Sequence, residues 1–225
     1  MSENPPASEV TDSSDQIAVR RSKRERLLAR GEEPYPVSVP VTATIAEVCA
    51  EYGHLEAGVE TDDEVGVSGR VVFQRNTGKL AFVTLQDGAG ERLQIMASQA
   101  VIGEERLADL KADVDLGDHV FFHGRVGASR RGELSIFADS WQMAAKAVRP
   151  LPVLHADLSE ESRVRRRYVD LIVRQEARDA VRLRSEVMYS LRESFRGREF
   201  VEVETPMLQV QPGGAAARQI GRAHV

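Results

Sequence analysis

The chain has 225 residues, of which 42% are hydrophobic and 29% charged, and its formal net charge is −5. This length suits two modest domains, and no run approaches the roughly 20 apolar residues of a membrane span, so we expect a cytoplasmic protein that binds no membrane. Cys49 is the single cysteine, which excludes an internal disulfide and a cysteine zinc cluster, and the five histidines show no metal-ligand spacing.

The N-terminal part divides into a tail and a helical region. Residues 1–16 are rich in Ser, Pro and acidic residues without an apolar period, which predicts a disordered tail. Within the helical region, residues 17–63, a first helix is expected at 17–30, ended by Gly31. Against one acid, Glu25, it carries the cations Arg20, Arg21, Lys23, Arg24, Arg26 and Arg30. Such a helix suits a nucleic-acid phosphate backbone; an ordinary solvated charged helix is the alternative.

A second, shorter helix is expected at residues 44–52. Thr44 and Glu47 have the spacing of a capping box at its start. Cys49 falls on its apolar face, so we expect Cys49 to pack in a core rather than act as a nucleophile.

Residues 64–148 predict five short strands with one helix between the third and the fourth, the outline of an OB-fold barrel in a chain of the α+β class. The strands are expected at 65–73, 80–86, 92–97, 119–126 and 133–143, and the helix at 99–111. Alternation places Val65, Val67, Val71 and Phe73 on one face of strand one, with Arg70 and Val72 opposite. The expected inward rows are Ala81, Val83 and Leu85 on strand two, Leu93, Ile95 and Ala97 on strand three, and Leu134, Ile136 and Ala138 on strand five. On strand five this leaves Ser135 and Phe137 facing out.

Residues expected outside the barrel combine an aromatic ring, cations, an amide and a carboxylate. They are Arg75, Phe82, Arg92, Gln94 and Glu133. This mixture suits a splayed nucleobase, because an exposed ring can stack on the base while polar groups read its edge. The alternative is that a neighbouring domain covers Phe82 and the polar side chains are merely solvated.

A second domain is expected after the barrel. Residues 149–158 form a linker stiffened by Pro150 and Pro152. Helices are predicted at 159–173 and 176–196, and a strand at 200–204 before Pro206. The last helix carries the apolar stripe Ala177, Val181, Met188, Leu191 and Phe195, expected to be buried.

Taken together, five segments resemble the N-terminal part of the class II lysyl-tRNA synthetases. They are GRVVFQRNTGKLAFVTLQD (69–87), RGELSI (131–136), KAVRPLP (146–152), RRYVDLIV (166–173) and FVEVETPMLQVQPGGAAAR (200–218). Aspartyl- and asparaginyl-tRNA synthetases share the OB-fold. The lysyl type is favoured by the basic helix before the barrel and by the segment 212–218.

The resemblance implies a partner and roles for the outward residues. The barrel would bind the U-rich anticodon of lysine tRNA. Phe82 falls on the family's stacking aromatic, Gln94 and Glu133 on base-reading positions, and Arg75 on a basic contact. Arg20, Arg21, Lys23 and Arg24 would contact the tRNA backbone.

In the second domain the resemblance implies a homodimer. Residues 176–208 match motif 1, the family's dimer interface, with Phe200 and Pro206 in it, and Gly213 or Gly214 would lie at the edge of the lysine pocket. Relatives commonly have glycine before the aromatic residue, where this chain has Glu199. If that position needs a positive φ, a glutamate there would be strained.

The family joins lysine to tRNA with ATP and Mg²⁺. Its motifs 2 and 3 and its magnesium carboxylates would lie beyond residue 225, so we expect this chain alone to contain no catalytic residue, to bind no cofactor and to be inactive. Residues 219–225 leave the family pattern and back-translate to a common sequencing-adapter sequence, which predicts a non-native tail; a genuine truncated paralogue is the alternative. For the function of the whole chain, the alternative is a stand-alone OB-fold RNA-binding module without enzymatic activity.

Overall fold

A computed structural model describes residues 7–152 and 158–207, which fall into two units, one ending at Arg178 and one beginning at Asp179. The strands are β1 (Glu60–Thr77), β2 (Leu80–Gln86), β3 (Arg92–Ser98), β4 (His119–Ala128) and β5 (Leu134–Ala145). The helices are α1 (Ala7–Ala29), α2 (Ile45–Tyr52), α3 (Gln99–Ile102), α4 (Glu104–Asp113), α5 (Glu160–Arg165), α6 (Arg167–Val173) and α7 (Gln175–Arg196). None of the helices in this described part is long and apolar enough to cross a membrane.

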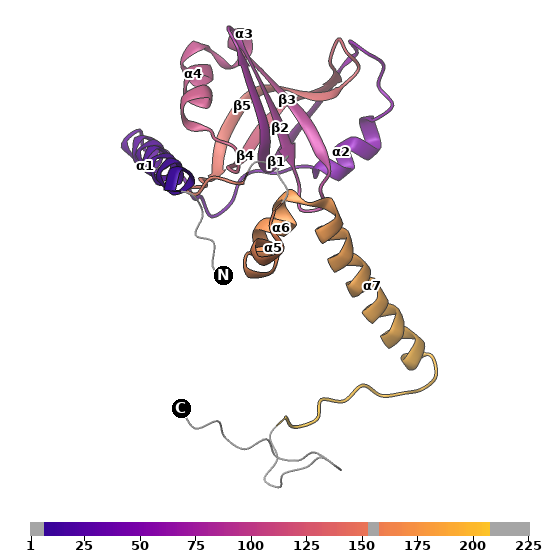
Figure 1. Cartoon of the computed structure of the whole chain (residues 1–225). Coiled ribbons are helices and arrows are strands. Elements are labelled where there is room, and N and C mark those ends of the chain that lie inside the picture. The colour runs from indigo at the N-terminus through magenta and orange to yellow at the C-terminus, as the bar shows by residue number, and fades with distance from the viewer. Residues whose placement is uncertain (1–6, 153–157, 208–225) are drawn as a thin grey trace. The chain divides into compact units, whose positions relative to one another are not determined.

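The five strands form the predicted OB-fold barrel (Figure 1). They close in the order β1-β2-β3-β5-β4, with β3 and β5 parallel and the other neighbours antiparallel. Closure pairs every strand on both sides and leaves no open sheet edge. The predicted inward residues of β2 and β3, Ala81, Val83, Leu85, Leu93, Ile95 and Ala97, are all at most 2% exposed. The helix expected at 99–111 breaks at Gly103, whose φ of 87° separates α3 from α4.

One irregularity in β1 changes which side chains face outward. The pairing with β2 shifts between Val71, opposite Leu85, and Phe73, opposite Thr84, so Val72 is an extra residue. A bulge of this kind reverses the alternation beyond it. The expectation that Phe73 joins the buried row was therefore wrong: Phe73 is 54% exposed, and Val72 is 5% exposed.

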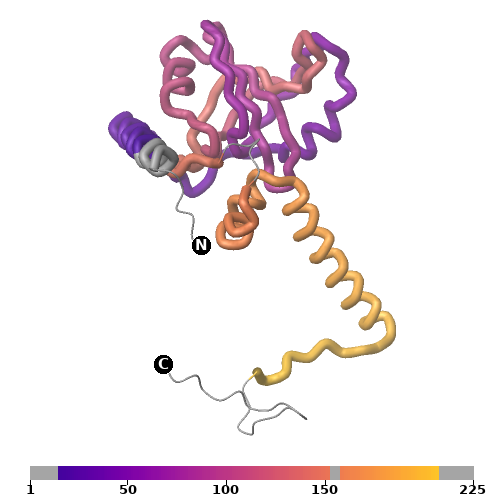
Figure 2. Tube along the Cα trace, viewed as in Figure 1, coloured from indigo at the N-terminus to yellow at the C-terminus, as the bar shows by residue number. Residues whose placement is uncertain are grey.

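Helix α1 packs against the barrel beside α4, and α2 lies on the opposite side (Figure 1). Helix α1 begins at Ala7, whereas the sequence analysis placed residues 7–16 in a disordered tail and expected the helix to begin at residue 17. Leu27 of α1 is fully buried in the core. The chain path in Figure 2 shows how α3 and α4 bridge β3 and β4 across one end of the barrel.

Helix α2 forms as predicted. The Thr44 hydroxyl accepts from the Glu47 amide at 3.1 Å, and the Glu47 carboxylate accepts from the Thr44 amide at 2.8 Å. Cys49 packs at the edge of the core, where burial, followed by the nearby charges of Glu91 and Asp87, raises the pKa of its thiol. A raised pKa keeps the thiol protonated, which agrees with a packing role.

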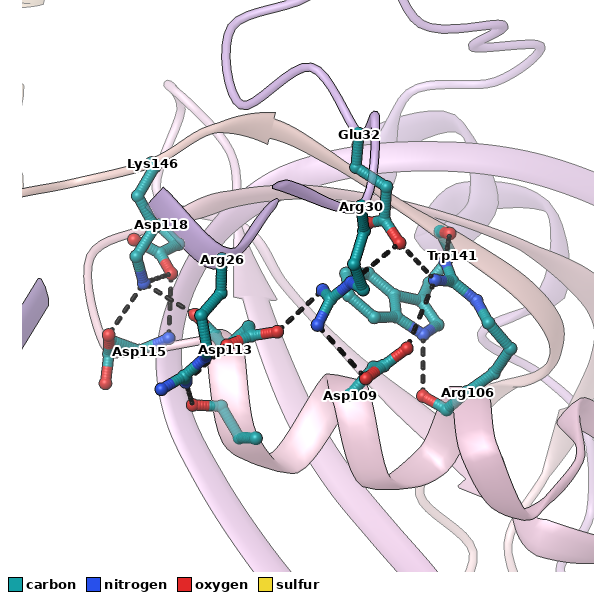
Figure 3. Close-up of polar contacts among 11 residues, drawn as sticks. Arg26, Arg30, Glu32, Arg106, Asp109, Asp113, Asp115, Asp118, Trp141 and Lys146 are labelled. Carbon is teal, nitrogen blue, oxygen red and sulfur yellow. Dashed lines mark hydrogen bonds and ion pairs between the residues drawn. The ribbon is translucent and has the colours of Figure 1, made fainter. Parts of the chain in front are cut away.

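A buried lysine joins three segments of this unit. Lys146, which follows β5, has no exposed side-chain surface, and its Nζ lies 2.6 Å from Asp115 Oδ2, Asp118 Oδ2 and the Asp113 carbonyl oxygen (Figure 3). Asp118 also accepts from the backbone amides of Asp115 and Ala147, each at 2.7 Å. Burial would raise the pKa of Asp115, but hydrogen bonds from Lys146 and Lys23 outweigh it and lower that pKa.

The part after the linker differs from its prediction. The helix expected at 159–173 breaks at Arg166 into α5 and α6, and the segment 200–204 is extended without strand pairing among the described residues. A strand needs a neighbour to satisfy its backbone, and the described chain supplies none there. In the stripe on α7 only Ala177 is buried, whereas Val181, Met188, Leu191 and Phe195 are 42–51% exposed. Glu199 has φ 65°, the strained value considered above.

Replacing Lys146 with Met should lower the free energy of unfolding by about 3–5 kcal/mol, because the buried Asp118 carboxylate would lose its counter-charge. Urea denaturation of the variant measures this change. Lys79→Met, at an exposed lysine in the β1–β2 turn, is the control and should change stability by less than about 0.5 kcal/mol. Equal effects of the two variants would contradict the structural role of Lys146.

His119 should make the stability of the barrel depend on pH. Burial and then the neighbouring Arg70 charge lower the pKa of His119 from 6.5 to about 4 in the folded state. The unfolded chain therefore takes up a proton first as pH falls. The stabilisation is complete above pH 6.5 and is lost progressively toward pH 4, by about 3 kcal/mol in all. The urea midpoint should depend less on pH across this range in His119→Gln than in wild type. His54→Gln, at an exposed histidine, should keep the pH dependence of wild type.

Candidate nucleic-acid interface

The bulge in β1 brings Arg75 opposite Phe82 on the outer face of the barrel. Strand register places Arg75, Phe82, Met96 and Phe137 in one row across β1, β2, β3 and β5. The Arg75 guanidinium carbon lies 4.8 Å from the centre of the Phe82 ring, a cation–π contact. The Phe82 ring is half-buried and keeps exposed surface, so it can still accept a stacked base.

A second row runs beside the first. Its members are Phe73, Thr84, Gln94 and Ser135. Gln94 is half-buried, and among residues 7–152 and 158–207 its side-chain amide makes no hydrogen bond. Ser135, expected to face solvent, is fully buried in this row, and its hydroxyl donates to the Glu133 carbonyl oxygen at 2.9 Å. A small side chain between larger neighbours is covered even on an outer face.

Glu133 lies outside this row, two residues before Ser135 in the turn that precedes β5. Its backbone is held by Ser129, whose hydroxyl accepts from the Glu133 amide at 3.1 Å and whose amide donates to the Glu133 carbonyl oxygen at 2.8 Å. The exposed Glu133 carboxylate forms no ion pair within the described chain. Ser135, two residues later, is opposite Gln94, so the amide and the carboxylate are near neighbours on one surface.

The structure thus places Arg75, Phe82, Gln94 and Glu133 on adjacent positions of one face. An aromatic ring flanked by a cation can hold a base by stacking, and an unengaged amide and carboxylate can hydrogen-bond its edge. Sequence reasoning missed Phe73, because a run of three apolar residues, Val71 to Phe73, hides the bulge. The structure, by contrast, shows a phenylalanine exposed beside this group.

The basic helix is divided between internal and exposed cations. Arg20 is 8% exposed and donates to the carbonyl oxygens of Leu116 and Ala147, each at 3.0 Å, and Lys23 lies 2.6 Å from Asp115. Arg21 is exposed, and Arg24 forms its one ion pair among the described residues with its neighbour Glu25, at 2.6 Å. Four cations were expected to contact a phosphate backbone. Two of them, Arg20 and Lys23, instead hold α1 on the barrel.

Arg26 and Arg30 are also used internally. Both contact the buried Asp113 carboxylate of α4, at 2.5 and 2.7 Å, and Arg30 contacts Asp109 at 3.2 Å (Figure 3). Arg106, which contacts Glu32 at 2.8 Å, covers Trp141 with its guanidinium 4.4 Å from the ring centre. These pairs fix α1 against α4.

In the unit that begins at Asp179, Phe200 is 64% exposed and its ring lies 5.5 Å from that of Phe195. Both rings line an open apolar groove with Met188 and Leu191 of α7. Pro206 is exposed in the extended segment that follows. Gly213 and Gly214, and the tail at 219–225, lie outside the described residues.

Residues 65–144 match the family of OB-fold nucleic acid binding domains, and residues 159–221 match the class II tRNA synthetases of the D, K and N type. The chain is 62% identical over 213 residues to a lysine–tRNA ligase of Kineococcus radiotolerans and 58% identical over 207 residues to one of Mycolicibacterium gilvum. It is 40% identical to the lysylphosphatidylglycerol biosynthesis bifunctional protein LysX of Mycobacterium ulcerans.

These alignments cover 95%, 92% and 91% of this chain but 43%, 41% and 18% of the respective relatives. The chain thus spans less than half the length of the curated ligases that it matches. The two matched segments coincide with the barrel and with the region from α5 onward. The chain therefore contains an OB-fold nucleic acid-binding domain followed by the start of a class II tRNA synthetase domain of the D, K and N type.

Proposed function

We propose that this chain is the anticodon-binding part of a lysine–tRNA ligase and that its barrel binds the anticodon of lysine tRNA. The observation that carries the proposal is the Arg75–Phe82 contact on the outer face of the barrel, with unengaged Gln94 and Glu133 beside it. The similarity to the lysine–tRNA ligases of Kineococcus radiotolerans and Mycolicibacterium gilvum points to lysine as the amino acid.

The binding chemistry follows from this face. An anticodon base stacks on Phe82, and Arg75, held over the same ring, supplies positive charge close to the RNA backbone. The Gln94 amide can both donate and accept, and the Glu133 carboxylate accepts, so together they can distinguish the edge of one base from another. Stacking supplies affinity and the polar pair supplies specificity.

The basic helix contributes to RNA binding through fewer residues than its composition indicates. Arg21 and Arg24 are the phosphate contacts, because neither is used in holding α1 on the barrel. Arg20 and Lys23 act indirectly, since they fix the helix that presents the other two. Phosphate contacts position the RNA without reading its sequence.

The region from α5 onward supports a role within a longer enzyme. Such a ligase would use ATP and Mg²⁺ to activate lysine in the cytoplasm, and motif 1, with Phe200 and Pro206, would pair with a second subunit. The exposed apolar row on α7 is suited to that contact. The 225-residue chain alone should show no lysine-dependent ATP–pyrophosphate exchange. A stand-alone RNA-binding module is the alternative, and an in-frame continuation of the genomic sequence into motifs 2 and 3 would exclude it.

Phe82→Ala should weaken binding of the lysine anticodon stem-loop by roughly 1–3 kcal/mol, because one base loses its stacking partner. Fluorescence anisotropy of a labelled stem-loop measures the dissociation constant. Val37→Ala removes a fully exposed side chain away from the sheet and serves as the matched control. Equal affinity of wild type and Phe82→Ala would refute the proposed function.

The double variant Arg21→Gln/Arg24→Gln should bind cognate and non-cognate stem-loops more weakly to the same extent. Each lost phosphate contact should reduce the slope of log K against log salt by about 0.7–0.9. Arg20→Gln/Lys23→Gln is the comparison, and its main effect should be a lower urea midpoint. An unchanged salt slope in the first variant would show that α1 contacts no phosphate.

A further inference from the structure

We propose that Phe73 is a second base-stacking residue, which binds the nucleobase next to the one on Phe82. This inference rests on the proposed function of the barrel and adds a subsite to it. Among the described residues of the five strands, Phe73 is the one large apolar side chain exposed to solvent by more than a third of its surface.

Strand register fixes the position of Phe73 relative to the first platform. Phe73 is opposite Thr84, and Phe82 lies two residues before Thr84 on β2. The two phenylalanines are therefore diagonal neighbours on one face, about 7–8 Å apart between Cα atoms. Proteins that bind single-stranded nucleic acid stack successive bases on neighbouring aromatic side chains, and this spacing allows that arrangement.

The bulge at Val72 supplies an independent argument. With regular alternation Phe73 would share the buried face of Val71, where burial of a large apolar side chain stabilises the fold. The extra residue turns both Phe73 and Arg75 outward. Bulges are over-represented next to active sites as well as at sheet edges and barrel rims, and they re-aim side chains there.

The surroundings of Phe73 suit a nucleobase better than a protein side chain. Thr84 lies directly opposite Phe73 and places a hydroxyl beside the ring, and Gln94, opposite Thr84 on the next strand, follows in the same row. Arg75, two residues further along β1, carries the positive charge that the adjoining phosphate needs. The subsite thus continues the face that holds Arg75 and Phe82.

The test uses the full 225-residue chain and lysine anticodon stem-loops carrying 2-aminopurine at one anticodon position at a time. Phe73→Ala should weaken binding about 5- to 150-fold, the range that one base–aromatic stack provides. Phe82→Ala should remove the fluorescence change of 2-aminopurine at one anticodon position. Phe73→Ala should remove the change at the neighbouring position and leave the change at the first position intact. Phe73→Tyr should restore both signals, and Val37→Ala should change neither.

The outcomes separate this inference from the function on which it rests. If Phe82→Ala weakens binding while Phe73→Ala binds and quenches like wild type, the second subsite is refuted and the proposed function stands. If both variants bind like wild type, both proposals fail. If Phe73→Ala and Phe82→Ala lose the same fluorescence signal, Phe73 supports the first base and the second subsite is refuted.

Discussion

The buried ammonium of Lys146 is the interaction on which the arrangement of the barrel and its helices depends. It lies between Asp115 and Asp118 of the turn before β4 and the last turn of α4, while Asp118 binds the backbone just after Lys146. Because removing one partner of a buried ion pair is strongly destabilising, the contacts of Lys146 hold these segments together. Through Asp115 the same cluster reaches Lys23 and so holds α1 on the barrel.

For function, the consequence is that some cations of the basic segment hold the helix on the barrel while others stay exposed. Cations that the sequence presents as one basic surface are divided, because Arg20, Lys23, Arg26 and Arg30 satisfy carboxylates and carbonyl oxygens of the barrel. Their partners from α4 onward lie 79 to 127 residues away in the chain. No local pattern reveals such pairs. The sequence therefore predicted a basic helix, but neither its start at Ala7 nor which of its cations remain available.

The barrel itself was largely predictable. Period-two alternation located β2 to the residue and identified the buried rows of β2 and β3, because one face of each strand packs in a continuous core. The outward positions of Phe82 and Gln94 followed from the same rule. The rule failed where one extra residue interrupts it, at Val72, since apolar residues on both sides of the bulge leave no mark in the pattern. The strand expected at 200–204 failed for a different reason, the lack of a pairing partner in the described chain.

We propose above that the outer face carrying Arg75, Phe82, Gln94 and Glu133 reads the lysine anticodon. A residue-resolved NMR titration tests this proposal by comparing the lysine anticodon stem-loop with the same stem-loop carrying an asparagine anticodon. We expect chemical-shift changes concentrated on β1, β2, β3 and the turn at Glu133, which saturate at a lower concentration of the lysine stem-loop. Changes confined to α1, or equal for the two anticodons, would contradict it.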